Sequence, residues 1–320
     1  MKKFLLLLVS LILLLGCSSK QDLKKIGIVS LVEHTSLNII KDSIMDELKN
    51  LGYVNGENCI IKFKNAQGDM SSLPTIMQNM KNDRVDVLIA ITTPVAQSAI
   101  SLTDNIPVVF SAVSDPVGAG ILSDINDTSK NITGTSDPIK VDQIIDFALK
   151  THNNTTKIGY IYNAGESNSI TSLNKLENYS KNKNILIEKI SITSSAEIQS
   201  AVSALSDKVD IIFVSNDNTI AEAMPILVNE ALKYKIPVYT GADSMVMDGG
   251  FASVGIDYVD VGVETARMAD KILNGMNTKD IKVELFDTKL NIYINKKTAE
   301  KLGFSIDDFK DIENLVIVGE

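Results

Sequence analysis

The chain contains no tryptophan, and its 320 residues include only two cysteines and two histidines. Zinc and most transition-metal centres need several histidine or cysteine ligands. The small number of these residues therefore argues against a metal site. We also find no glycine-rich phosphate loop and no nucleophile elbow, which are sequence signatures of nucleotide-binding and ester-hydrolysing enzymes. These absences favour a protein that is not an enzyme and needs no cofactor.

Arginine is as scarce as histidine, because Arg84 and Arg267 are the only two. Neither follows a predicted strand, so we do not expect a bidentate arginine clamp on a carboxylate ligand. The formal net charge is −9, and no long basic run is present. Such a chain is unsuited to the phosphate backbone, so nucleic acid is not an expected partner.

One long hydrophobic run is present, at the start of the chain. A short basic region precedes an apolar segment over residues 4–15. This segment is shorter than the ~20 residues that span a bilayer and is typical of a secretory signal peptide. It ends in Leu-Leu-Gly-Cys over residues 14–17, which resembles the bacterial lipobox.

The lipobox resemblance implies a signal peptide over residues 1–16, cleavage before Cys17 and a lipid on the Cys17 thiol. The chain would then be extracytoplasmic, anchored to the bacterial cell membrane through a lipidated tether over residues 17–23. Cys59 is the only other cysteine, so no disulfide is expected. We expect Cys59 to be a small core residue rather than a nucleophile.

Three segments of the first half recur in the same order about 130 residues later, which indicates one pattern used twice. In the segments that begin at Ile106 and Ile236, a short apolar run turns into small polar and acidic residues, as a buried parallel strand does when it ends at a ligand crevice. The pattern predicts two similar α/β lobes. The paired segments are 25–29 with 157–161, 85–89 with 209–213, and 106–116 with 236–244.

Between the strands, apolar residues at spacings of three and four predict helices, as at Leu37, Ile40 and Ile44. Strands alternating with helices predict a mostly parallel sheet in each lobe. We expect order throughout, except in the tether and the final residues. The strands expected are 25–30, 59–64, 85–91, 107–112, 157–162, 185–190, 209–214, 237–240 and 290–294.

Several local features predict helix ends. Thr93 before Pro94 and Asp137 before Pro138 have the form of N-caps. Ser194 and Glu197 fit a capping box. A helix containing Pro225 must kink or restart there. His152 follows a predicted helix end, where we expect it on the surface.

In parallel sheets, ligands bind beyond the carboxyl ends of the strands, and polar clusters occupy these ends here. Two lobes would place two such edges opposite each other across a cleft. The candidate ligand-binding residues are Glu33, His34, Thr92, Thr93, Ser111, Val113 through its N–H, Ser114, Asp115, Asn163, Glu166, Asn168, Asn216, Asp217 and Asp243.

The lipobox and an ordered set of motifs resemble the tryptophan/tyrosine-type substrate-binding lipoproteins of bacterial ABC importers. The motifs are Glu33-His34, Thr92-Thr93-Pro94, the segments 114–120 and 131–134, Asn163 with Glu166 and Asn168-Ser169, Asn216-Asp217-Asn218, and the segments 255–258 and 294–295.

The resemblance covers nearly the whole mature chain. It implies a type I periplasmic-binding-protein fold, with two Rossmann-like lobes and three hinge crossings. We place the first lobe at 24–136 plus 258–287, and the second at 137–257 plus 288–320. It also implies an aromatic amino acid as ligand, ABC permease subunits as partners and a monomeric receptor.

Residue roles follow from the resemblance and from the needs of an α-amino acid. In related receptors an acid after the later strand of the second lobe takes the ammonium, and Asp243 matches that place. The carboxylate would be held by hydroxyl and N–H groups at the start of the helix that begins at Thr93 and Pro94. Ser111 and the N–H groups of Val113 and Ser114 could supply further donors. Glu33 and His34 could face a phenol O–H or an indole N–H.

Some alternatives stay open. Thr93, Asp137 and Asp217 could be caps only, and Asp115 could make a turn before Pro116. The residues do not choose among tyrosine, tryptophan and phenylalanine. The same fold could also serve a surface adhesin or sensor, or a receptor for another small molecule.

Overall fold

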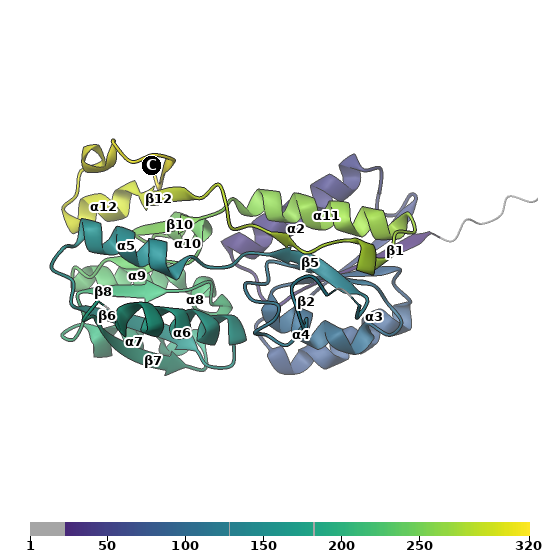
Figure 1. The fold of residues 1–320 in the computed structure, drawn as a ribbon, viewed down its shortest axis with the longest axis horizontal. Coiled ribbons are helices and arrows are strands. Elements are labelled where there is room, and N and C mark those ends of the chain that lie inside the picture. Colours follow the sequence, from purple (N-terminus) through teal and green to yellow (C-terminus); the bar gives the residue numbers. More distant parts are fainter. Residues whose placement is uncertain (1–22, 128, 182) are drawn as a thin grey trace, which may run out of the picture.

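The computed structural model describes residues 23–127, 129–181 and 183–320, so the predicted signal peptide and Cys17 lie outside the described residues. Figure 1 shows two α/β lobes side by side along the long axis of the molecule. Within the described ranges, we find no helix with the length and hydrophobicity that spanning a membrane requires.

The first lobe is built on a six-stranded sheet in the order β11-β5-β4-β3-β1-β2. All its pairings are parallel; Ile28, for example, lies opposite Phe63 on one side and Ile89 on the other. Its strands are β1 (Lys24–Ser30), β2 (Cys59–Asn65), β3 (Val87–Ile91), β4 (Val108–Ser111), β5 (Ile132–Ser136) and β11 (Glu284–Leu285).

Helices cover both faces of this sheet, with α2 and α11 above it and α3 and α4 below it in Figure 1. The helices are α2 (Thr35–Asn50), α3 (Leu73–Asp83), α4 (Thr93–Ala99) and α11 (Tyr258–Leu273), with 3-10 turns η1 (Met70–Ser72), η2 (Ile100–Leu102) and η4 (Thr278–Asp280).

The second lobe has a seven-stranded sheet in the order β13-β12-β10-β9-β8-β6-β7. The β10–β12 pair is antiparallel, and the other strand pairs described in this sheet are parallel. The strands are β6 (Lys157–Asn163), β7 (Leu186–Ile192), β8 (Ile211–Val214), β9 (Val238–Thr240), β10 (Ala252–Gly255), β12 (Asn291–Asn295) and β13 (Leu315–Val318).

The core of the second lobe has two layers, because α5, α6 and α12 pack on one face of the sheet while α7, α9 and α10 pack on the other. The helices are α5 (Val141–Thr151), α6 (Ser167–Lys181), α7 (Ile198–Leu205), α8 (Asn218–Glu222), α9 (Met224–Lys233), α10 (Asp243–Met247) and α12 (Lys296–Leu302), with η3 (Ser195–Glu197) and η5 (Ile306–Phe309).

The two sheets share one topology, which confirms the repeat seen in the sequence. The order β5-β4-β3-β1-β2 of the first lobe matches β10-β9-β8-β6-β7 of the second. The chain passes between the lobes three times, after β5, after β10 and after β11. These crossings bring the carboxyl ends of β5 and β10 to the boundary between the lobes.

Helices α2 and α11 pack closely, and both contribute residues to that boundary. A Cβ atom at Gly262 of α11 would lie 2.7 Å from the Ile40 carbonyl oxygen of α2, so the absence of a side chain permits the contact. The close packing fixes Tyr258, at the start of α11, relative to Ser36 and Leu37 of α2. Ile40 and Leu37 are buried.

Strand expectations fail where the sequence pattern is weak. β5 and β10 were not expected as strands, because Ile132-Thr133-Gly134-Thr135-Ser136 and the segment at β10 are poor in large apolar residues. The hydroxyl of Thr133 is satisfied within the fold, by the Ile281 carbonyl at 2.8 Å. The final residues are ordered, since β13 pairs with β12 in parallel.

Local helix predictions have mixed outcomes. The capping box of Ser194 and Glu197 is confirmed, and the chain restarts as α9 at Met224, with Pro225 in the first turn. The Thr93 cap is wrong, because Thr93 is the first residue of α4 and Thr92 precedes it. The Asp137 cap is also wrong, because α5 begins only at Val141.

His152 is only partly exposed and packs against the aromatic core, whereas the prediction placed it on the surface. Its ring lies 5.2 Å from the Phe304 ring and 5.7 Å from the Phe251 ring, centroid to centroid. Its Nδ1 atom lies 2.8 Å from the Tyr239 hydroxyl. The prediction considered only the local helix end, whereas packing against the aromatic core decides the position. Cys59 is buried, as expected of a small core residue.

Candidate ligand-binding cavity between the lobes

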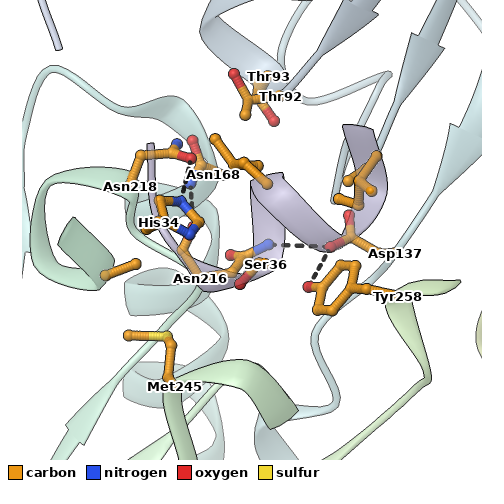
Figure 2. Close-up of a pocket in the computed structure, with 14 residues that line it drawn as sticks. His34, Ser36, Thr92, Thr93, Asp137, Asn168, Asn216, Asn218, Met245 and Tyr258 are labelled. Atoms are coloured by element: carbon orange, nitrogen blue, oxygen red, sulfur yellow. Dashed lines mark hydrogen bonds between the residues drawn. The ribbon is translucent and has the colours of Figure 1, made fainter. Parts of the chain in front are cut away.

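A small cavity lies at the boundary of the lobes, where the space between atoms amounts to about 370 Å³ when the part open to solvent is included. Figure 2 shows Asp137 and Tyr258 on one side and His34, Asn168 and Asn218 on the other. The lining residues are His34, Ser36, Leu37, Ile40, Thr92, Thr93, Ala112, Asp137, Asn168, Asn216, Asn218, Ala221, Met245 and Tyr258.

Thr92 connects β3 to α4 with a strained backbone of φ 91° and ψ 159°. A β-branched residue rarely adopts such angles, and the strain is of order 1–3 kcal/mol. The Thr92 N–H donates to the Ser111 carbonyl at 2.9 Å, which helps to hold this geometry. The Thr92 hydroxyl is buried without a hydrogen-bond partner, so it is available to a molecule in the cavity.

Asp137 follows β5 at the first crossing and is 3% exposed. Its Oδ2 accepts from the Tyr258 hydroxyl at 2.8 Å and from Asn216 Nδ2 at 3.2 Å, and its Oδ1 accepts from the Ser114 hydroxyl at 3.2 Å. Burial raises the pKa of the Asp137 carboxyl to about 6, against the opposing effect of these hydrogen bonds. Asp137 and Tyr258 lie at two of the hinge crossings, Ser114 belongs to the first lobe and Asn216 to the second. The hydrogen-bond network therefore connects the hinge to both lobes.

Glu166 and Asp217 are fully buried acids behind the second-lobe wall. Glu166 accepts from the N–H groups of Asn218 and Thr219, both at 3.0 Å. Asp217 caps α8 by accepting from the Ile220 N–H at 3.1 Å. Burial raises the pKa of the Asp217 carboxyl, and the negative charge of Glu166 raises it further. These acids organise the wall and do not line the cavity.

His34 lies at the start of α2, and its Nε2 atom is 3.3 Å from Asn218 Oδ1 across the lobe boundary. Burial lowers the pKa of the His34 imidazole to about 4, so the ring is neutral at pH 7. No lysine or arginine is among the described residues that line the cavity. The Asp137 carboxylate is therefore the charged group of the lining.

The lobes touch directly through hydrogen bonds near the cavity. The Thr35 hydroxyl donates to Asp248 Oδ1 at 2.8 Å, and Asn216 Nδ2 donates to the Ser114 hydroxyl at 2.6 Å. The hydroxyls of Ser36 and Ser244 are also hydrogen-bonded. The lobes are thus in a closed arrangement.

The predicted site residues fall into three groups in space. His34, Thr92, Thr93, Asn168 and Asn216 line the cavity. Four lie behind the wall, among the polar groups that hold it: Ser114, Asn163, Glu166 and Asp217. The other five do not line the cavity: Glu33, Ser111, Val113, Asp115 and Asp243.

The first-lobe members of this last group are exposed or have hydrogen-bond partners within the protein, and the ligand contacts predicted for them stay predictions. Glu33 is exposed. The Ser111 hydroxyl is 2.8 Å from the Thr265 hydroxyl, and the Val113 N–H donates to the Thr135 carbonyl at 3.2 Å. Asp115 Oδ1 accepts from the Gly118 N–H at 2.8 Å, as expected of a turn.

The ammonium role predicted for Asp243 stays a prediction, because Asp243 is not among the residues that line this cavity. Asp243 is the first residue of α10, and its Oδ1 accepts from the Ser244 N–H at 2.7 Å. Burial raises the pKa of its carboxyl to about 7. The cavity instead presents Asp137, which sequence reasoning treated as a possible cap.

Other lining residues were not singled out by the sequence. Tyr258 was noted only within a hinge crossing, and Asn218 only within a motif. Met245 lies on α10 and gave no signal. The position of Asp137 directly after β5 would have been the signal, had β5 been recognised as a strand.

Two mostly parallel α/β lobes around an interlobe cavity define a type I periplasmic binding protein, the class of fold that the sequence predicts. A family model described as ABC transporter substrate binding protein matches residues 25–310. The chain therefore belongs to the family of ABC transporter substrate-binding proteins.

Named relatives are similar over most of their length. The tyrosine-binding protein of Clostridioides difficile (strain R20291) is 36% identical over 300 residues, covering 93% of this chain and 86% of the relative. A Streptococcus pneumonia domain solved in complex with L-Trp is 34% identical, with 92% and 100% coverage and a TM-score of 0.86.

The ligand-free, open structure of a substrate-binding protein with adhesive properties from Clostridium difficile is 35% identical. It covers 92% of this chain and 99% of its own, yet the TM-score is only 0.69. The L-Trp complex reaches 0.86 at nearly the same identity. The lobes of this chain are thus arranged more like those of the complex, in agreement with their direct hydrogen bonds.

Proposed function

We propose that the chain is the extracytoplasmic substrate-binding lipoprotein of an ABC importer and that it binds an aromatic amino acid between its lobes. Tyrosine and tryptophan are the leading candidates, and phenylalanine is the third. Family membership supports the transport role. The relative named for tyrosine and the neighbour solved with L-Trp support the ligand class.

The observation that carries the proposal is Asp137, a buried carboxylate in a lining without lysine or arginine. A buried charge without a counter-charge favours a cationic ligand group. An α-ammonium group would pair with Asp137 and could also donate to the amide oxygen of Asn216, which is buried without a partner.

The rest of an amino acid has matching surroundings. The unpaired Thr92 hydroxyl is a donor for the α-carboxylate. Apolar side chains suited to an aromatic ring come from both lobes, with Leu37 and Ile40 on one side and Ala221 and Met245 on the other.

Closure of the lobes would couple binding to transport. A ligand that contacts both lobes favours the closed form, and the closed form is the state that permease subunits would recognise. The hydrogen bonds of Thr35, Ser36 and Asn216 across the boundary would stabilise the same state.

The membrane anchor belongs to the same proposal. Lipidation of Cys17, which lies outside the described residues, would hold a monomeric receptor at the cell membrane. Labelling of cells with palmitate should mark the wild-type chain and should not mark Cys17→Ser. Equal labelling of both would contradict the anchor.

The test of ligand class is thermal unfolding of the refolded, ligand-stripped mature chain with each of the three aromatic amino acids, leucine, tyramine and myo-inositol. A ligand at ~1,000 times its Kd should add ~4 kcal/mol to the free energy of unfolding. We expect large shifts only with aromatic amino acids. A shift with myo-inositol and none with any amino acid would overturn the proposal. Tyramine as effective as tyrosine would remove the role of the carboxylate.

A surface adhesin is the second candidate function, because a 35% identical neighbour has adhesive properties. Adhesion and transport separate in one experiment. Attachment to host cells that persists in an Asp137→Asn variant without ligand binding would show an adhesive surface independent of the cavity.

A further inference from the structure

Glu166 is 0% exposed and lies one layer behind the cavity wall. Its Oε2 accepts from the Asn218 N–H at 3.0 Å, and its Oε1 accepts from the Thr219 N–H at 3.0 Å. The Thr219 hydroxyl adds a bond to Oε1 at 3.0 Å. A backbone N–H can only donate, so both Glu166 oxygens act as acceptors.

This carboxylate fixes the orientation of two asparagine amides. Asn218 Nδ2 donates to Glu166 Oε2 at 2.6 Å, and Asn168 Nδ2 lies 3.4 Å from the same oxygen. Turning either amide over would bring its oxygen against the carboxylate. Asn168 also donates to the Asn216 carbonyl at 3.1 Å, which leaves Asn168 Oδ1 buried and unpaired at the cavity.

The orientation of Asn218 determines the tautomer of His34. Asn218 Oδ1, which can only accept, lies 3.3 Å from His34 Nε2. Nε2 must therefore carry the hydrogen, and in the neutral ring Nδ1 then keeps a lone pair. Figure 2 shows the His34 ring between Asn218 and the side chains of Asn216 and Ser36. No hydrogen bond to Nδ1 is present in the described part of the chain.

We propose that Glu166 is a positioning residue that makes His34 Nδ1 and Asn168 Oδ1 acceptors, so that the cavity prefers aromatic amino acids whose ring carries a hydrogen-bond donor. Tyrosine has a phenol O–H and tryptophan an indole N–H, whereas phenylalanine has neither. The inference rests on the proposed function. His34 and Asn168 lie on the opposite side of the cavity from Asp137 (Figure 2). The ring of a ligand whose ammonium group is bound by Asp137 would lie on that side.

The preference has an expected size. A site built to hydrogen-bond a ligand group leaves polar atoms unpaired with an analogue that lacks the group, which is the basis of strong discrimination. Calorimetric titration of the wild type should show tyrosine binding at least tenfold more tightly than phenylalanine. O-methyltyrosine, whose oxygen cannot donate, should bind no more tightly than phenylalanine.

Two variants test whether Glu166 acts on the ligand preference through Asn218 and His34. In His34→Leu the tyrosine-to-phenylalanine affinity ratio should fall to within about threefold of unity, with phenylalanine affinity largely kept. Glu166→Gln should lower the ratio in the same way, because a neutral amide no longer fixes Asn218. Glu222→Gln is the matched control, since it makes the same change at an exposed position of α8 and should leave the ratio unchanged. An unchanged ratio in His34→Leu would overturn the inference.

The tautomer can be measured directly by nitrogen NMR, because the chain has only two histidines. A His152→Gln variant assigns the signals. In tyrosine-saturated protein, His34 should have a protonated Nε2 and an unprotonated Nδ1. The opposite tautomer would overturn the inference, even if Glu166→Gln fails to fold.

The two proposals fail in different ways. A wild-type protein that binds no aromatic amino acid removes the proposed function and this inference together. A protein that binds all three aromatic amino acids with equal affinity keeps the proposed function and removes only the role of Glu166.

Discussion

Asp137 and Glu166 are both buried carboxylates near the cavity, and their hydrogen bonds differ in kind. Asp137 accepts from three side chains, those of Ser114, Asn216 and Tyr258. Glu166 accepts from two backbone N–H groups and from the side chains of Asn168, Asn218 and Thr219. One carboxylate lines the cavity, and the other stands behind the wall.

The two carboxylates differ in how many further hydrogen bonds each can still accept. An ionised carboxylate offers about four lone-pair sites. Three donors leave Asp137 with room for one more, on the oxygen that receives only the Ser114 hydroxyl. Five donors leave Glu166 with none. A carboxylate near a cavity can thus bind a ligand or orient the groups that do, according to how fully its neighbours saturate it.

The largest expected effect separates these two roles at Asp137. Asp137→Asn should lower the affinity for every aromatic amino acid at least 100-fold, because the α-ammonium loses its charged partner. Isothermal titration calorimetry measures the loss. Asp115→Asn, in the turn closed by Gly118, is the control and should bind normally. A loss of less than tenfold at Asp137 would assign the ammonium elsewhere.

A smaller effect concerns Asp243, the acid that the sequence favoured for the ammonium. Its folded-state pKa of about 7 lies above the unfolded value, so folding takes up a proton between those pH values. This contribution to stability is present at low pH and is lost as the pH rises through 7. Chemical denaturation should show about 2 kcal/mol of it between pH 5 and pH 8.

The Asp243→Asn variant should lack this pH-dependent contribution while keeping ligand affinity within a fewfold of wild type. A loss of affinity as large as that of Asp137→Asn would restore Asp243 as the ammonium partner and would contradict the comparison of Asp137 with Glu166.

The smallest effect tests closure without touching the cavity. Thr35→Val removes the donor to Asp248 across the lobe boundary. The closed form should lose about 1 kcal/mol, which lowers affinity roughly fivefold. Calorimetry measures the affinity, and small-angle scattering measures opening. Thr193→Val is the control, because its hydroxyl bonds Glu197 within one lobe. Equal affinities in the two variants would exclude a role for the Thr35 contact in closure.

The strands that sequence reasoning found are those with continuous apolar runs, such as Val87–Ile91, whose five side chains are all buried. β5 is buried as completely, yet its threonines and glycine hide it, because burial of Thr133 and Thr135 depends on partners from distant segments. His152 was misplaced for the same reason, since its aromatic neighbours are far away in the sequence.

Within the cavity, His34, Thr92, Asn168 and Asn216 could be predicted because each follows a strand that the pattern revealed. Asp137 follows the strand that the pattern concealed, and the Pro138 beside it suggested a helix cap. Asp243 follows a recognisable strand, but its side chain does not reach the cavity lining.

The sequence by itself determined the two-lobe repeat and the family, because apolar runs and motif order are local and survive without knowledge of contacts. The tertiary structure alone decided which acid lines the cavity and how the side chains of His34, Asn168 and Asn218 are oriented there. These choices depend on hydrogen bonds between residues far apart in the chain, such as the 3.3 Å contact of His34 with Asn218, and no pattern along the chain records them.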